Sequence, residues 1–240
     1  YQIVEDKDGN IVKEGEIFPQ KNYISNSVEE TVRNVLPKYL GYSVEDILEW
    51  VKSTEAISKR LEWGAVWRNV YRRDFLNINQ IRFNPSIRLN EDSMFNAMCF
   101  SRAQKIRTLN KGFYCYTIRP SGAFMKKRDA ELVGNKMALL EARSNIVNDL
   151  NERGFNFYVK DYAGSNVMSC FELIIKMPFS ARRETKKYIS NLLVKESIKI
   201  LPFTGRKKVD IPLLALKCNL QALMIYAVNL GKLFGVQFQL

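Results

Sequence analysis

Two adjacent carboxylates, Glu91 and Asp92, are the side chains of this sequence best placed by type and spacing to do chemistry. They follow Asn90, a residue that often precedes a helix, and lead into an apolar segment that ends at Phe100. The positive end of a helix keeps a carboxylate ionised, so one that faces a cleft there can accept a proton from a hydroxyl. The alternative is that both acids only complement the helix dipole, and the residues themselves leave both interpretations open.

The composition makes carboxylates the main candidates for acid and base chemistry. The 240 residues include no histidine, which excludes Ser-His-Asp and Cys-His catalytic pairs, imidazole catalysis and zinc sites with histidine ligands. Cys99, Cys115, Cys170 and Cys218 form no C-x-x-C pair, so we expect reduced, buried thiols in a cytosolic protein. The hydrophobic fraction of 46% predicts a sizeable core in one large domain or two smaller ones.

The charges are unevenly distributed along the chain. Residues 1–62 carry 8 basic and 12 acidic side chains, whereas residues 63–240 carry 29 basic and 13 acidic ones. A basic surface attracts nucleic acid, anionic lipid headgroups or phosphorylated substrates, and a merely solvated basic surface is the alternative. The sequence contains no zinc finger, helix-turn-helix or RNP-type motif, so we expect no nucleic-acid partner.

Short strands and helices are predicted around the two carboxylates. A hairpin is expected near the N-terminus, with Asp6 and Asp8 in its Gly-terminated turn, where a divalent-metal site is the alternative to simple turn chemistry. Ser27 and Ser43 are predicted to begin helices. Strands are expected at 64–71, 81–83, 106–109 and 112–118, and a short helix or turn is expected to start at 74–76. Longer helices are expected at 91–100, 132–150, 167–175 and 185–200.

From Trp63 to Ser121 the sequence resembles the acceptor half of family 2 glycosyltransferases, which are inverting enzymes with the GT-A fold. The likeness is carried by four motifs in order: W-x-x-x-Y-R-R at 67–73, an apolar F-containing strand at 81–83, E-D at 91–92 and Y-x-Y-x-x-R-x-S at 114–121. The resemblance implies an α/β fold in three parts. These are the acceptor-side half of a GT-A domain at 1–124, made of mixed short strands and helices, an α-helical extension at 125–205 and a basic amphipathic C-terminal helix at 206–240.

The resemblance also implies roles for individual residues. In this family the Asp of the E-D pair is the general base that deprotonates the acceptor hydroxyl, which corresponds to Asp92 here. Glu91 would orient Asp92 or the acceptor, and Trp67, Arg119 and Ser121 would contact the acceptor. Filling the core is the alternative role for Trp67.

The donor half of such enzymes, with its D-x-D metal motif, has no counterpart in these residues. We therefore expect a C-terminal portion of a longer bacterial-type enzyme, inactive by itself, whose parent uses Mg or Mn while this chain ligates no metal. The alternative is a homologue without donor machinery that acts as a non-catalytic membrane-surface or glycan-interaction module. The sequence Q-K-I-R at 104–107 matches only part of the Q-x-x-R-W motif of processive enzymes, which favours transfer of one sugar per encounter.

The last segment combines basic and apolar residues. Arg206, Lys207 and Lys208 precede a leucine-rich stretch in which only 14 residues separate Lys217 from Lys232, too few to span a bilayer. A helix lying in the membrane interface and a helix packed on the protein's own core both fit this pattern. The expected partners are a nucleotide-sugar donor, a glycan or lipid-linked acceptor and an anionic membrane surface, for a cytoplasmic protein peripheral to the inner face of the cytoplasmic membrane.

Overall fold

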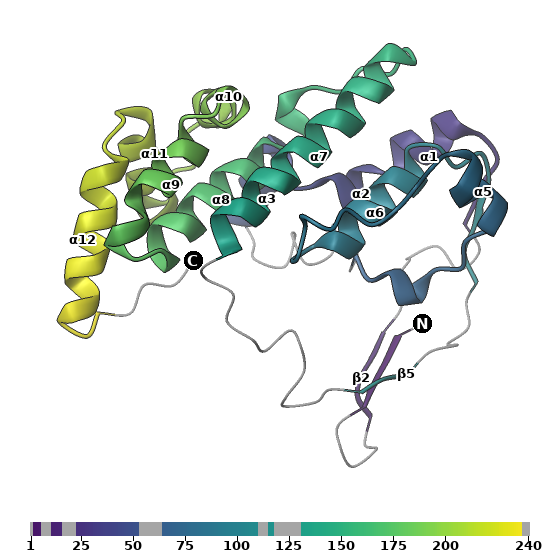
Figure 1. The fold of residues 1–240 in the computed structure, drawn as a ribbon, viewed down its shortest axis with the longest axis horizontal. Coiled ribbons are helices and arrows are strands. Elements are labelled where there is room, and N and C mark those ends of the chain that lie inside the picture. Colours follow the sequence, from purple (N-terminus) through teal and green to yellow (C-terminus); the bar gives the residue numbers. More distant parts are fainter. Residues whose placement is uncertain are drawn as a thin grey trace. The chain divides into compact units, whose positions relative to one another are not determined.

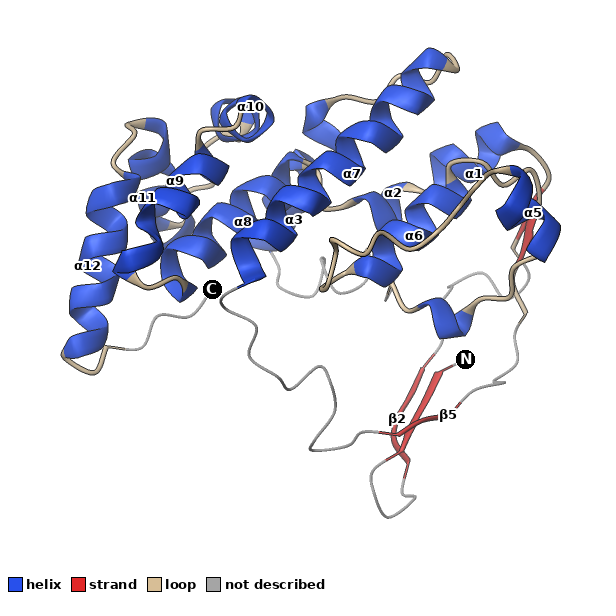
Figure 2. Cartoon of the chain, in the orientation of Figure 1, coloured by secondary structure: helices blue, strands red, loops and turns tan. Residues whose placement is uncertain are grey.

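The chain divides into two compact units. The computed structural model describes residues 2–5, 11–15, 23–52, 64–109, 115–117 and 131–236. The first unit comprises residues 1–39, 62–84 and 91–128, and the second comprises 40–61, 85–90 and 129–240. Helices predominate in the part of the chain that is described, and the strands are short (Figure 1 and Figure 2).

The first unit combines two small sheets with short helices. Its strands are β1 (Gln2–Glu5), β2 (Ile11–Gly15), β3 (Ile24–Ser25), β4 (Ile106–Arg107) and β5 (Cys115–Thr117). Its helices are α1 (Val28–Asn34), the 3-10 helix η1 (Val66–Arg68), α5 (Arg73–Ile78) and α6 (Glu91–Phe100), and α2 (Pro37–Leu40) lies at the boundary between the units. In one sheet β1 pairs antiparallel with β2 and parallel with β5, and in the other β3 pairs antiparallel with β4.

The predicted N-terminal hairpin is confirmed by the pairing of β1 with β2, although Asp6 and Asp8 lie outside the described residues. Two predicted strands are wrong. Residues 64–71 form η1 with extended flanks, because their polar groups bond to side chains of α6 rather than to a neighbouring strand. Residues 81–83 also form no strand, since the Ile81 amide donates to the Leu76 carbonyl at the end of α5.

Aromatic packing on α6 forms the described core of the first unit. Phe95 is buried with Ile81 and Cys99. The Phe83 ring stacks on Phe95 with the ring centres 4.3 Å apart, and the Tyr71 ring meets Phe95 edge-on at 5.4 Å. Such aromatic pairs add to the free energy gained by burial alone. They hold the segments before and after α5 against one face of α6.

The second unit is a bundle of helices arranged around α8. Its members are α3 (Val44–Lys52), α7 (Leu132–Glu152), η4 (Val159–Asp161), α8 (Ala163–Lys176), η5 (Phe179–Ala181), α9 (Arg182–Ile189), α10 (Leu192–Ile200), α11 (Lys207–Lys217) and α12 (Gln221–Leu233). Helix α8 contacts α3, α7, α9, α10 and α12. In Figure 1 it runs through the middle of this unit, with α12 in yellow at one edge.

Small residues at the start of α8 permit a close backbone approach. A Cβ atom added to Gly164 would lie 2.5 Å from the Ser43 carbonyl oxygen. Next to it, the Ser165 amide donates to the Tyr42 carbonyl at 3.1 Å, and the Ser165 hydroxyl accepts from the Tyr42 amide at 2.7 Å. The buried Arg143 of α7 donates from Nε to the Leu40 carbonyl at 2.7 Å. Residues 40–43 are therefore tied to two helices of this unit.

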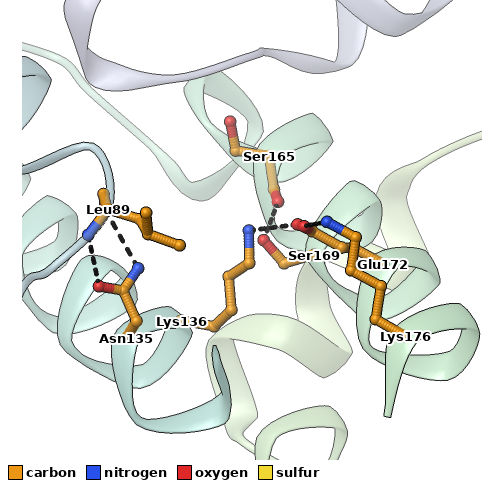
Figure 3. A network of polar contacts seen from close by, with 7 residues as sticks. All are labelled: Leu89, Asn135, Lys136, Ser165, Ser169, Glu172 and Lys176. Atoms are coloured by element: carbon orange, nitrogen blue, oxygen red, sulfur yellow. Dashed lines mark hydrogen bonds and ion pairs between the residues drawn. The ribbon is translucent and has the colours of Figure 1, made fainter. Parts of the chain in front are cut away.

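A polar network joins α7 to α8 (Figure 3). Lys136 of α7 lies 2.6 Å from a carboxylate oxygen of Glu172 on α8, and Lys176 donates to the other oxygen at 2.7 Å. Burial alone would raise the pKa of the Glu172 carboxyl, but the two lysines outweigh it and lower that pKa below its usual range. In the same view, the Asn135 side chain accepts from the Leu89 amide and donates to the Leu89 carbonyl.

The longer predicted helices are present, with two breaks that were not expected. Helix 185–200 is divided into α9 and α10 because Asn191 caps α10, its side chain accepting from the Leu193 amide at 2.9 Å. The predicted single helix at 206–240 is two helices, α11 and α12. They separate at Asn219, which has a φ of 57° in the left-handed region that asparagine tolerates and that ends helices. The GT-A fold class and the three-part domain division stay predictions.

Candidate functional site

The Asp92 carboxylate lies in the first turn of α6 and contacts η1. Its Oδ2 atom accepts a hydrogen bond from the Val66 amide at 3.3 Å. Val66 is the first residue of η1, so the carboxylate caps this turn and neutralises one of its unpaired amides. Oδ1 accepts no hydrogen bond from any residue that the structure describes. One oxygen of Asp92 is thus occupied by the backbone and the other is available.

The turn capped by Asp92 carries Trp67, and the structure therefore brings these two predicted site residues into one neighbourhood. Trp67 is half-buried, so its ring presents one part to the protein and another to solvent. Glu91 is also half-buried in the first turn of α6, and it makes no hydrogen bond or ion pair within the described residues. Arg119 and Ser121, the other predicted acceptor contacts, lie outside those residues.

Asn96 holds the segment that contains Trp67 against α6, and the sequence analysis missed it. This fully buried side chain donates from Nδ2 to the Gly64 carbonyl at 2.7 Å. Its Oδ1 atom accepts from Asn69 Nδ2 at 3.0 Å and from the Tyr71 hydroxyl. One feature of the sequence could have identified Asn96. It is a polar amide in the middle of an apolar helical segment, and it lies four residues after Asp92, which places both side chains on the same face of the helix.

The same contact requires a glycine at position 64. A Cβ atom added to Gly64 would lie 1.8 Å from the Ser93 hydroxyl oxygen and 2.9 Å from the Ser93 Cα. Both distances are shorter than van der Waals contact, so any larger residue would push residues 64–66 away from α6. The position of the Asp92 cap therefore depends on Gly64 as well as on Asn96.

Two other titratable groups of this region, Tyr71 and Cys99, are held in their protonated forms. Burial raises the pKa of the Tyr71 phenol well above its usual value, and the nearby Asp92 charge acts in the same direction. Burial likewise raises the pKa of the Cys99 thiol to about 12. At neutral pH Tyr71 is a hydrogen-bond donor and Cys99 an uncharged thiol, so neither serves as a base or as an activated nucleophile. The carboxylates of Asp92 and Glu91 are the groups here that can accept a proton, and Asp92 is the one that contacts η1.

The described residues do not fit a resident metal. Among them, no group of three or more carboxylate or cysteine side chains is clustered closely enough to hold an ion. The D-x-D of Asp6 and Asp8 lies in the part of the chain that is not described.

A part of the chain is similar to a glycosyltransferase. Over 56 residues it is 38% identical to the uncharacterized glycosyltransferase EpsJ of Bacillus subtilis (strain 168). This match covers 23% of the present chain and 16% of that protein. No protein-family model matches the chain, and no solved structure does. The similarity supports glycosyl transfer as the general class of activity.

Proposed function

We propose that this chain is the acceptor-side part of an inverting family 2 glycosyltransferase of the GT-A fold, with Asp92 as its general base. The observation that carries the proposal is the Asp92 carboxylate in the first turn of α6, with one oxygen on the Val66 amide and the other available beside the turn that bears Trp67. The similarity to EpsJ supports the class of reaction.

The proposed reaction is a direct displacement at the anomeric carbon of a nucleotide-sugar. Asp92 takes the proton of the acceptor hydroxyl as the oxygen forms its bond to the sugar. The bond between the anomeric carbon and the diphosphate breaks, and the nucleoside diphosphate leaves with the electron pair. The Val66 amide fixes the carboxylate in place, which reduces the cost of orienting it for the proton transfer. Proton transfer by a positioned base contributes about 10²–10⁴-fold to a rate.

The remaining roles follow from the family resemblance. Glu91 orients Asp92 or the acceptor, while Trp67, Arg119 and Ser121 contact an acceptor that is a nascent polysaccharide or a lipid-linked glycan. The nucleotide-sugar and its Mg or Mn ion bind to the donor half of a longer parent protein. The parent works at the inner face of the cytoplasmic membrane and transfers one sugar per encounter.

The activity is tested on the native gene product that contains this chain. We expect acceptor-dependent release of a nucleoside diphosphate from one member of a panel of nucleotide-sugars. Nuclear magnetic resonance of the product then gives the anomeric configuration, and inversion is the expected result. Retention of configuration would contradict the displacement mechanism, and absence of turnover with the whole panel would contradict the assignment to nucleotide-sugar chemistry.

Docking on an anionic membrane is the second candidate function, favoured by the surface of α11 and α12. Buried residues such as Ile225 and Val228 lie on one face of α12, which supports packing of that face on the second unit. The opposite face is also apolar, and its exposed members are Leu223, Tyr226, Leu230, Leu233 and Phe234. Residues 182–236 carry 11 basic and 3 acidic side chains, which complement anionic lipids.

No helix among the described residues is long and apolar enough to cross a membrane. Replacing Leu233 and Phe234, which are 82% and 79% exposed, with glutamine should weaken binding of the chain to phosphatidylglycerol vesicles without changing its stability. Unchanged vesicle binding by this variant would refute the membrane-docking candidate.

A further inference from the structure

The C-terminal helices line a pocket, open to solvent, that the proposed function does not use. It has a volume of about 370 Å³ and lies among α9, α10, α11 and α12. Its polar lining consists of Ser190, Lys195, Lys199, Lys217, Asn219 and Gln221, and its remaining lining is aliphatic. We call it the lysine pocket. Its volume is within the range of small-molecule sites, about 300–1,000 Å³.

The three lysines of the lysine pocket give it an uncompensated positive charge. Lys195 and Lys199 are four residues apart on α10 and thus on the same face, an arrangement of like charges that destabilises a helix. Lys217 comes from the last turn of α11. Within residues 131–236, none of the three pairs with a carboxylate, and none of the described lining residues is acidic. The pocket is therefore suited to an anion.

Lys217 is held at the pocket by two contacts. Its Nζ atom donates to the Lys199 carbonyl at 3.1 Å and lies 5.4 Å from the centre of the Phe203 ring. The carbonyl bond uses one of the three donors of the ammonium group, and a cation over an aromatic ring keeps its full charge. The side chain is thereby ordered at the pocket with donors left for a ligand.

Gln221 adds an amide side chain to the three lysines. It lines the lysine pocket, is only 6% exposed, and its buried Oε1 atom has no hydrogen-bond partner within the described chain. Gln221 is also the first residue of α12, whose N-terminus has no side-chain cap, so unpaired amides and the positive helix end are present here.

We propose that the lysine pocket binds a phosphate group, either as a phosphomonoester or as a diphosphate. Several ammonium donors, an amide and a helix N-terminus together match the multiple oxygens and the charge of phosphate better than they match a single carboxylate. The pocket has room for a phosphate with part of the organic group attached to it. This inference does not depend on the proposed sugar transfer, because no residue of the α6 site takes part in it.

The phosphate can belong to a soluble compound or to a lipid headgroup. Leu220 and Phe203, both exposed apolar residues, lie beside the lining residues Asn219 and Lys217 respectively. An apolar rim of this kind is compatible with a lipid-borne phosphate, whereas a soluble diphosphate requires only the pocket. The two sources share the same recognition chemistry, and the experiment separates them.

The test uses the full 240-residue chain and two charge-matched double variants. K195Q/K199Q removes two pocket lysines, and K186Q/K187Q removes two exposed lysines of α9 that do not line the pocket. Isothermal titration with inorganic pyrophosphate reports the soluble source. Flotation with phosphatidylcholine vesicles, with and without phosphatidic acid, reports the lipid source. Unfolding midpoints of both variants establish that the fold is retained.

We expect K195Q/K199Q to weaken phosphate binding by about tenfold or more, as loss of charged hydrogen bonds implies, and K186Q/K187Q to change it by less than about twofold. Loss of pyrophosphate binding in the pocket variant supports a soluble ligand, and loss confined to phosphatidic acid vesicles supports a lipid headgroup. Equal weakening by both variants would show diffuse charge attraction and overturn the proposal. Absence of any binding that depends on Lys195 and Lys199 would overturn it as well.

Discussion

Replacing Asn96 with alanine should detach residues 64–71 from α6. The Asn96 side chain is fully buried and makes three hydrogen bonds to this segment, one to the Gly64 carbonyl, one from Asn69 and one from the Tyr71 hydroxyl. The Asn96→Ala variant loses all three bonds and leaves these partners partly buried without a replacement.

The size of the effect follows from the number of bonds. A hydrogen bond of this kind contributes about 1 kcal/mol net, so the three together predict a loss of about 3 kcal/mol in the free energy of unfolding of the first unit. Tyr71→Phe removes only one of the bonds and should cost about 1 kcal/mol. Because Tyr71 and Asn96 share that bond, the double variant should be less destabilised than the sum of the single variants.

Urea unfolding followed by tryptophan fluorescence measures these differences, and Asn77→Ala is the matched control. Asn77 lies exposed on α5, where it accepts a hydrogen bond from Arg82 at 2.8 Å, and its loss should cost less than about 0.5 kcal/mol. A loss for Asn96→Ala no larger than that of the control would refute the view that Asn96 holds the segment bearing Trp67.

Three further predictions concern the second unit. Gly164→Ala should lower the free energy of unfolding of this unit by about 1–3 kcal/mol, because the new Cβ lies 2.5 Å from a backbone oxygen. Gly134→Ala in α7, where the space around the glycine is open, should raise it by up to about 1 kcal/mol. Equal unfolding midpoints of the two variants would contradict this prediction. Glu172→Gln should cost about 2 kcal/mol at pH 7 through its pair with Lys136. Since the folded pKa of Glu172 is lowered, this loss should vanish as the pH falls through that pKa, and a loss that persists in acid would count against the ion pair. Cys218 should react with iodoacetamide faster than the two other described cysteines, which are buried, as mass spectrometry of the labelled peptides would reveal.

Helix starts were predictable from the sequence because their signals are local. Ser27 accepts from the Glu30 amide at 3.1 Å to begin α1, and Ser43 with Asp46 forms a reciprocal cap for α3. Each of these signals requires only residues three positions apart. The ends of α8 and α10 before Pro178 and Pro202 follow from the same kind of local constraint.

The failed strand prediction at 64–71 has a different cause. Residues 64–71 have the composition of a strand, but their hydrogen bonds go to Asp92 and Asn96, which lie more than 20 residues later in the sequence. No local pattern reports such partners. The sequence identified Asp92 through its position at a helix start, whereas it could not reveal that the carboxylate also caps η1. The lysine pocket was missed for the same reason, because its lining residues come from helices that are separate in the sequence.

The central claim is that Asp92 is a catalytic base and not only the cap of η1. Its most direct test is the rate of sugar transfer by the native gene product carrying Asp92→Asn, compared with Asp74→Asn, a control at the exposed first turn of α5. Asparagine keeps an oxygen for the Val66 amide but cannot take up the proton, so we expect a rate reduced by about 10²–10⁴-fold with the fold retained. The Asp74→Asn rate should be unchanged. Transfer by the Asp92→Asn protein at the rate of the control would contradict the account.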